Sequence, residues 1–122
     1  MSNLSALVGA VISCWYPQHD KPSQPGPKFR PVLVVGFDSK AKRINVVYGS
    51  SQRTHQLGRG EITFTPDEIN GLSKDTKFSL RNAAWLPLCS DFFACSSGKY
   101  QILGTIPKAR LGQLEDAIEE TV

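Results

Sequence analysis

The stretch PGPKFRPVLVVG, residues 25–36, sets an arginine and a proline directly against an unbroken apolar run. Pro31 fixes its own φ, lacks an N–H and biases Arg30 towards extended backbone, so the pair opens a strand or lies at an edge. The run Val32–Val35 is too apolar for a strand with one face in water, and Gly36 ends it. The stretch therefore predicts a strand that is buried on both faces.

Arg30 stands at the mouth of this strand. A guanidinium stays charged, and an isolated buried charge is very unfavourable. We therefore expect the Arg30 side chain at the rim of the fold, directed at water, a phosphate or a carboxylate such as that of Asp20.

Hydrophobic patterning predicts short, mostly extended elements along the rest of the chain. Strands are expected at 9–16, 31–37, 43–50, 60–66 and 100–107, with at least one more in residues 76–88 around a break at Pro87. The segment 65–72 reads as a single helical turn.

A terminal helix is expected over residues 107–121. Leu111, Leu114 and Ile118 recur there at helical spacing and predict one apolar stripe. The elements together predict a mainly β fold, a small barrel of five to six short strands with a C-terminal α-helix laid against it.

Length and composition indicate one ordinary globular domain, residues 1–122, with 40% hydrophobic and 20% charged residues. The three cysteines form no C-x-x-C pair and have no ligand spacing with a histidine, which predicts reduced thiols in a cytoplasmic protein. We expect no metal, no cofactor, no signal peptide and no membrane span.

Charge is distributed unevenly along the sequence. Residues 1–60 carry a net charge of +6 and residues 61–122 a net charge of −3, so the basic half contains Arg30. A local positive field attracts polyanions and makes nucleic acid a reasonable partner. A solvated basic surface explains the charge equally well.

Four segments, in this order along the chain, resemble the PemK/MazF family of toxins from bacterial toxin–antitoxin pairs. They are GAVISCWYP, RPVLVVGF, INVVYGSSQ and ILGTIPKARLGQLEDAI, and together they span nearly the whole sequence. The resemblance implies an SH3-like barrel, usually a homodimer, that cleaves single-stranded RNA without a metal and is blocked by a cognate antitoxin protein.

The resemblance also implies site residues. The family's arginine before proline matches Arg30, and its Thr or Ser at the end of the third strand matches Ser50, with Ser51 as the competing alignment. His19 corresponds loosely to a histidine in the first loop of some members. A further Arg and Asp of some members have no clear counterpart, because Arg81 lies nearby but does not align.

Cleavage of RNA by its own 2′-OH needs a proton acceptor, charge stabilisation on the phosphoryl oxygens and a proton donor for the leaving oxygen. Arg30 suits the second role because its planar fork matches two phosphate oxygens. Ser50 or Ser51 can donate to the same phosphate, and His19 or His55 suits proton transfer. The residues expected to bind RNA are Lys28, Gln52, Arg53, His55 and Arg59.

Simpler explanations stand beside these assignments. The serines lie in a Gly-Ser turn where local hydrogen bonding is common, and the histidines and arginines can be solvated loop residues. Three functions therefore remain open: a metal-independent endoribonuclease, a non-enzymatic growth inhibitor that binds a protein target on the same barrel, and a plain interaction module.

Overall fold

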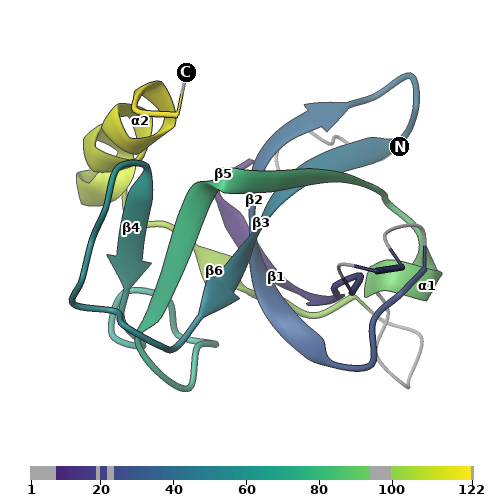
Figure 1. The fold of residues 1–122 in the computed structure, drawn as a ribbon, viewed down its shortest axis with the longest axis horizontal. Coiled ribbons are helices and arrows are strands. Elements are labelled where there is room, and N and C mark those ends of the chain that lie inside the picture. The colour runs from purple at the N-terminus through teal and green to yellow at the C-terminus, as the bar shows by residue number, and fades with distance from the viewer. Residues whose placement is uncertain (1–7, 19, 22–23, 94–99, 122) are drawn as a thin grey trace.

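The computed structural model describes residues 8–18, 20–21, 24–93 and 100–121. Six antiparallel strands form one sheet that curls into a half-barrel, with a helix at the C-terminal end (Figure 1). The elements are β1 (Ala10–Trp15), β2 (Phe29–Asp38), β3 (Arg43–Ser50), β4 (Glu61–Phe64), β5 (Thr76–Pro87), α1 (Ser90–Phe93), β6 (Ile102–Thr105), the 3₁₀ helix η2 (Lys108–Arg110) and α2 (Leu111–Glu119).

The strand order is β4-β5-β3-β2-β1-β6, so β2 and β3 lie at the centre of the sheet. This confirms the mainly β fold class with a terminal helix. The strands expected at 60–66 and 100–107 are shorter than predicted, because β4 and β6 span only four residues each. Pro87 ends β5, as its missing N–H predicts.

The central strand β2 is buried on both faces, which confirms the interpretation of its apolar run. Val32, Leu33 and Val34 are fully buried. Leu33 packs into one core with residues of β4 and β5, whereas Val32 and Val34 belong to a second core that Phe92 and Phe93 of α1 cover. Each face of β2 therefore has its own hydrophobic core.

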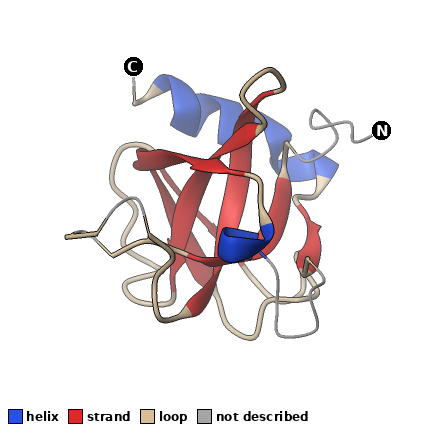
Figure 2. Ribbon diagram, turned by 90° about the vertical axis from the view of Figure 1, so that its right-hand side faces the viewer, coloured by secondary structure: helices blue, strands red, loops and turns tan. Residues whose placement is uncertain are grey.

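The two helices lie on different parts of the sheet, α2 beside β4 and α1 beside β1 (Figure 2). The predicted helical turn at 65–72 is present: the Ile69 N–H donates to the Thr65 carbonyl at 3.0 Å. At its end the Gly71 N–H donates to the Leu103 carbonyl at 2.9 Å, which ties the turn to β6.

The apolar stripe predicted for the terminal helix is confirmed at Leu114 and wrong at Leu111 and Ile118. Leu114 is buried, but Leu111 and Ile118 are 42% and 38% exposed, and Ala117 takes their place against the sheet. The helix is thus rotated about its own axis relative to the prediction. Arg110 explains this rotation, because its guanidinium donates to the Thr63 carbonyl and to Glu68 and so fixes which side of the helix meets β4.

Candidate functional site

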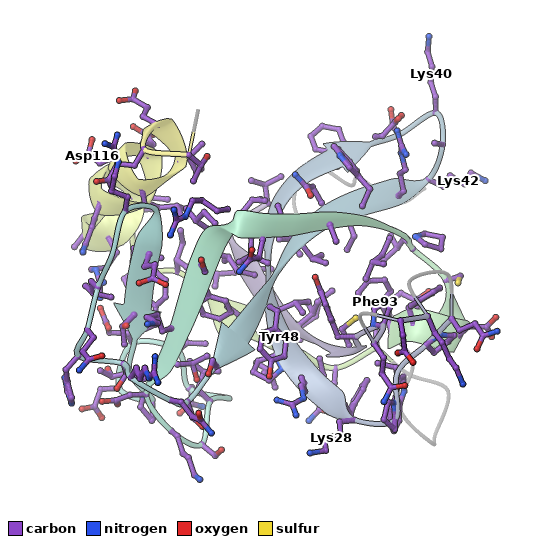
Figure 3. All side chains as sticks on the ribbon, in the orientation of Figure 1. Lys28, Lys40, Lys42, Tyr48, Phe93 and Asp116 are labelled. Carbon is purple, nitrogen blue, oxygen red and sulfur yellow. The ribbon has the colours of Figure 1, made fainter. Side chains whose placement is uncertain are left out.

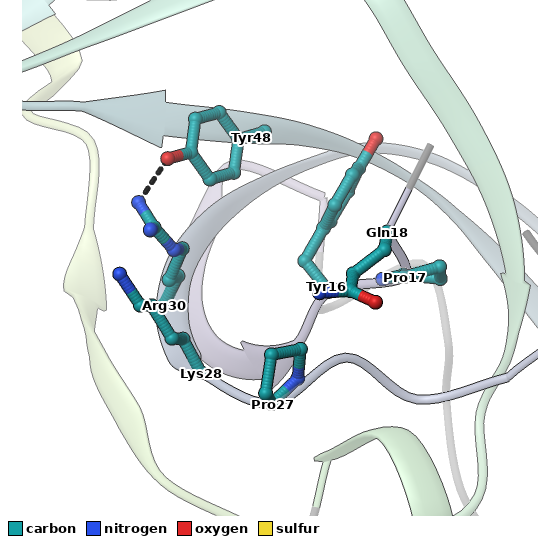
Figure 4. Close-up of a pocket in the computed structure, with 7 residues that line it drawn as sticks. All are labelled: Tyr16, Pro17, Gln18, Pro27, Lys28, Arg30 and Tyr48. Atoms are coloured by element: carbon teal, nitrogen blue, oxygen red, sulfur yellow. Dashed lines mark hydrogen bonds between the residues drawn. The ribbon is translucent and has the colours of Figure 1, made fainter. Parts of the chain in front are cut away.

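Arg30 lies at the mouth of β2, opposite Cys14 of β1. Its Nη1 donates a hydrogen bond to Tyr48 Oη, and its Cζ lies 5.2 Å from the centre of the Tyr48 ring (Figure 4). Among the described residues no ion pair includes Arg30, so the pairing with Asp20 considered from the sequence is not found. The guanidinium of Arg30 therefore contacts the hydroxyl and the ring of a tyrosine.

A pocket of about 400 Å³ opens beside this guanidinium, within the size range of small-molecule sites. In Figure 4 the Lys28 and Arg30 side chains lie side by side on one wall, with Tyr48 above them and Tyr16 across the opening. The two tyrosine rings lie 5.4 Å apart. The pocket is lined by Tyr16, Pro17, Gln18, Pro27, Lys28, Arg30 and Tyr48. It combines two cations with two aromatic faces.

A second hollow, of about 240 Å³, adjoins Arg30 on the other side of the strand end. Ser51 and Lys74 line it together with Arg30. Ser50 instead lines a third pocket, of about 330 Å³, beyond Tyr48. Neighbouring serines therefore serve different pockets, as the alternation of side chains along an extended chain requires.

The third pocket opens where β5 leaves β3. Val47 pairs with Ala83 and Gly49 with Phe78, so a single residue of β3, Tyr48, stands opposite residues 79–82 of β5. Figure 1 shows the resulting bend in β5. The lining residues are Tyr48, Ser50, Gln52, Arg53, Glu61, Lys77, Ser79 and Asn82.

An ion pair joins two of the residues that line this third pocket. Glu61 Oε1 accepts a hydrogen bond from the Gly58 N–H at 2.6 Å and lies 3.5 Å from Lys77 Nζ. The Gly58 N–H, followed by the charge of Lys77, holds the pKa of Glu61 below its usual range. Lys77 Nζ also donates to the Gln56 carbonyl at 3.0 Å.

Burial has a different consequence for the groups under Arg30. It raises the pKa of the Cys14 thiol to about 12, so this sulfur stays protonated and is a poor nucleophile. Burial, followed by the proximity of Cys14, also raises the pKa of Tyr16. Tyr16 is therefore a neutral ring at physiological pH.

The structure brings together most of the residues proposed from the sequence, although over more than one pocket. Lys28 joins Arg30, and Gln52 and Arg53 join Ser50. The Gln52 N–H donates to Ser50 Oγ at 3.1 Å, so the local hydrogen bond considered for this serine is also present. Arg53 has a φ of 54°, which is uncommon for a residue other than glycine.

The other proposed residues lie elsewhere. His55 is exposed in the loop between β3 and β4. Arg59 precedes Gly60, whose N–H donates to Glu120 just after α2, so this part of the loop runs towards the helix. His19 lies outside the described residues.

The basic half of the sequence does not form one patch. Figure 3 shows Lys28 close to Tyr48, whereas Lys40 and Lys42 extend from the far end of the β2–β3 hairpin. The charge asymmetry along the sequence therefore overstates the positive charge at the site.

Sequence reasoning missed Tyr48, which lines two of the pockets, and four further lining residues: Tyr16, Glu61, Lys77 and Asn82. One signal was available for Tyr48, because strand alternation puts it on the same face as Ser50. Glu61 and Lys77 meet only through the pairing of β4 with β5, which no local pattern specifies.

The described residues lack two kinds of feature. They contain no group of three or more His, Cys, Asp or Glu side chains placed to hold a metal ion. No helix among them has the length and apolar character needed to cross a membrane.

Comparison with solved structures shows what this arrangement of strands is. The chain matches an endoribonuclease from a Mycobacterial species in complex with its cognate antitoxin, with a TM-score of 0.64 and 15% identity over 94% of this chain and 92% of that one. It also matches the Mycobacterium tuberculosis toxin MazF-mt6, with a TM-score of 0.59 and 20% identity over 89% and 94% of the two chains. The chain has a PemK/MazF-like fold.

A further solved structure, a toxin from the same organism, matches the PemK/MazF-like fold of this chain with a TM-score of 0.59. It is 20% identical over 76% of this chain and 92% of that one. No protein-family model and no curated protein sequence matches the chain. The likeness is thus one of three-dimensional structure, and it establishes the fold.

Proposed function

We propose that this protein is a toxin-type endoribonuclease that cleaves single-stranded RNA by attack of the 2′-OH, without a metal ion. The observation that supports this proposal is the state of Arg30. Its guanidinium has no carboxylate partner among the described residues, is held by Tyr48, and lines a pocket together with Lys28. A phosphate is the ligand that such a pair of cations favours.

Each chemical step of the proposed reaction is assigned to particular side chains. The 2′-oxygen loses its proton and bonds to phosphorus, the bond from phosphorus to the 5′-oxygen breaks, and that oxygen takes up a proton. Negative charge on the phosphoryl oxygens is stabilised by Lys28 and by Arg30, whose Nε and Nη2 donate to none of the described residues. Ser51, which lines a hollow with Arg30, or Ser50, which lines the pocket beyond Tyr48, is proposed as the hydroxyl donor at the phosphate. His19 or His55 is proposed as the proton-transfer group.

The products test this mechanism directly. Single-stranded RNA incubated with the protein should yield fragments ending in a 2′,3′-cyclic phosphate and fragments beginning with a 5′-hydroxyl. EDTA should leave the rate unchanged, and RNA with 2′-deoxyribose at the cut position should resist cleavage. A 5′-phosphate on the product, or inhibition by EDTA, would contradict the mechanism. Intact RNA beside growth arrest would favour the non-enzymatic inhibitor.

We also propose that a cognate antitoxin protein neutralises this chain, that it forms a homodimer and that it acts in the cytoplasm. A toxin with this fold occurs in complex with its cognate antitoxin, which supports the first point.

Exposed apolar side chains on β6 and α2, such as Ile102 at 58% and Leu111 at 42%, support a surface that a second copy of the chain covers. Light scattering should give twice the chain mass of 13.4 kDa. The free thiols of Cys14 and Cys89 suit a reducing compartment.

A further inference from the structure

The pocket beyond Tyr48, lined by Glu61, Lys77, Ser79 and Asn82, is separate from the Arg30 pocket but shares Tyr48 as a wall. We call it the Glu61 pocket. It exists because β5 bulges away from β3 at Tyr48, and Ser79 and Asn82 mark the two ends of the bulged segment. Bulges often occur beside active sites, where they redirect side chains. The Glu61 pocket thus adjoins the position that the proposed function gives to the reacting phosphate.

Two polar groups of the Glu61 pocket, the Glu61 carboxylate and the Lys77 ammonium, are held in place by the protein itself. Lys77 and Glu61 side chains are only 13% and 17% exposed, and each is also bonded to the backbone of the loop between β3 and β4. Among the described residues, the Gly58 N–H and Lys77 Nζ both contact Glu61 at Oε1, so Oε2 can accept a further hydrogen bond. The pocket therefore presents a rigid carboxylate acceptor beside an ammonium donor.

We propose that the Glu61 pocket is a nucleobase subsite, in which Glu61 accepts from an exocyclic amino group of the base and Lys77 donates to a neighbouring acceptor. The inference rests on the proposed function and specifies its substrate. Unstacked bases of single-stranded RNA are read on their edges and stack on aromatic rings, and Tyr48 supplies such a ring at the wall. Cytosine, adenine and guanine carry an amino group and uracil does not. The pocket therefore selects against uracil.

A purely structural role for the Glu61–Lys77 pair is the competing explanation, because both residues anchor the loop that contains Gln56 and Gly58. The chain offers a matched control. Glu68 likewise accepts from a backbone N–H, that of Thr65 at 3.1 Å, and pairs with Arg110 at 2.5 Å. Glu68 lies in the turn after β4, so the same substitution there removes a similar ion pair away from the Glu61 pocket.

The test compares cleavage preferences. A random-sequence pool of single-stranded RNA is cut by the wild-type protein, Glu61→Gln and Glu68→Gln, and the new ends are sequenced. We expect wild type to disfavour uracil at one position near the cut. In Glu61→Gln, whose amide can donate to the carbonyl oxygens of uracil, that discrimination should fall by about 5- to 150-fold. Glu68→Gln should keep the wild-type profile.

Asn82→Ala provides a second variant that leaves the ion pair intact, since Asn82 is exposed on β5 and lines the Glu61 pocket. It should shift preference at the same position by a smaller factor. A wild-type profile without discrimination against uracil, an unchanged profile in both Glu61→Gln and Asn82→Ala, or equal shifts in Glu61→Gln and Glu68→Gln would overturn the subsite. Failure of the wild-type protein to cut any RNA would instead overturn the proposed function, and the subsite with it.

Discussion

The two ends of the β2–β3 hairpin each place an arginine over an aromatic ring, yet they leave these arginines in different electrostatic states. Near the turn, Arg43 Cζ lies 4.9 Å from the Trp85 ring and its Nη2 lies 3.4 Å from Asp38. At the open end, Arg30 lies over Tyr48 and bonds to its hydroxyl. A carboxylate neutralises Arg43, whereas a phenol orients Arg30 without neutralising it.

Arg110 follows the pattern of Arg43, because it lies over the Phe64 ring and pairs with Glu68. A paired arginine beside a ring stabilises the fold at that point. An oriented but unneutralised arginine retains its charge for a ligand. The chemical group that contacts each arginine therefore indicates whether the arginine has a binding or a structural role. It is a clearer indicator than the solvent exposure of the arginine.

The largest effect is expected from removing each arginine in turn. Arg30→Ala should reduce single-turnover RNA cleavage by on the order of 10² to 10³, the loss typical of deleting one preorganised donor from a developing oxyanion. Thermal unfolding should hardly change. Arg30→Lys should recover part of the rate, since a point charge lacks the planar fork.

Arg43→Ala is the matched control and should cleave RNA like wild type, because its ion pair lies at the other end of the hairpin. A destabilised but fully active Arg30→Ala protein would give Arg30 the structural role of Arg43. Equal losses in the two variants would remove the distinction between the two ends.

A second test gives Arg30 the kind of partner that Arg43 has. Tyr48→Glu should place a carboxylate beside Arg30, compete with the phosphate and lower cleavage by about tenfold or more. Tyr48→Phe keeps the ring and loses one hydrogen bond worth about 1 kcal/mol, so a loss of only about fivefold is expected. Single-turnover rates on both variants, with circular dichroism as the control for folding, decide the matter. A Tyr48→Glu protein as active as wild type would show that the charge state of Arg30 is irrelevant.

The smallest expected effect is on thermal stability and concerns Asp38, the partner of Arg43 near the hairpin turn. The Ala41 N–H foremost, together with Arg43, holds the pKa of Asp38 below its usual value of 3.8. Because the pKa of Asp38 is lower in the folded than in the unfolded protein, the ionised carboxylate stabilises the fold at pH values above the unfolded pKa. This stabilisation is lost as the pH falls from about 3.8 through the pKa of the folded state. Asp38→Asn should therefore unfold at a slightly lower temperature than wild type at pH 7. The two curves should converge in acid, and a difference independent of pH would contradict this.

The sequence specifies the centre of this fold well and its bulge poorly. Pro31 and the apolar run after it predict a doubly buried strand with Arg30 at its mouth, because these constraints are local. The shape of the Glu61 pocket depends instead on where β5 leaves β3, and that pairing joins residues some thirty positions apart. The rotation of α2 was missed for the same reason, since Arg110 reaches Glu68 only in three dimensions.

The site residues divide in the same way. Arg30 could be proposed from its neighbours in the sequence, and the two serines from the resemblance to the PemK/MazF family. Tyr48 was missed because its partner, Arg30, lies on another strand. Glu61 and Lys77 had no local signal as a pair, because they meet across the β4–β5 ladder.

Gly49 has no side chain to offer a substrate, yet it decides which serine stands beside the guanidinium. A Cβ at this position would lie 2.6 Å from Thr76 Cγ2 and 2.8 Å from Phe78 Cε1, so the chain can pass between β2 and β5 only with glycine at this point. Sliding β3 by one residue would bring Tyr48 or Ser50 into that gap and exchange the faces of the two serines. Gly49 thus fixes the register of β3. That register places Ser51 in the hollow beside Arg30 and Ser50 in the Glu61 pocket.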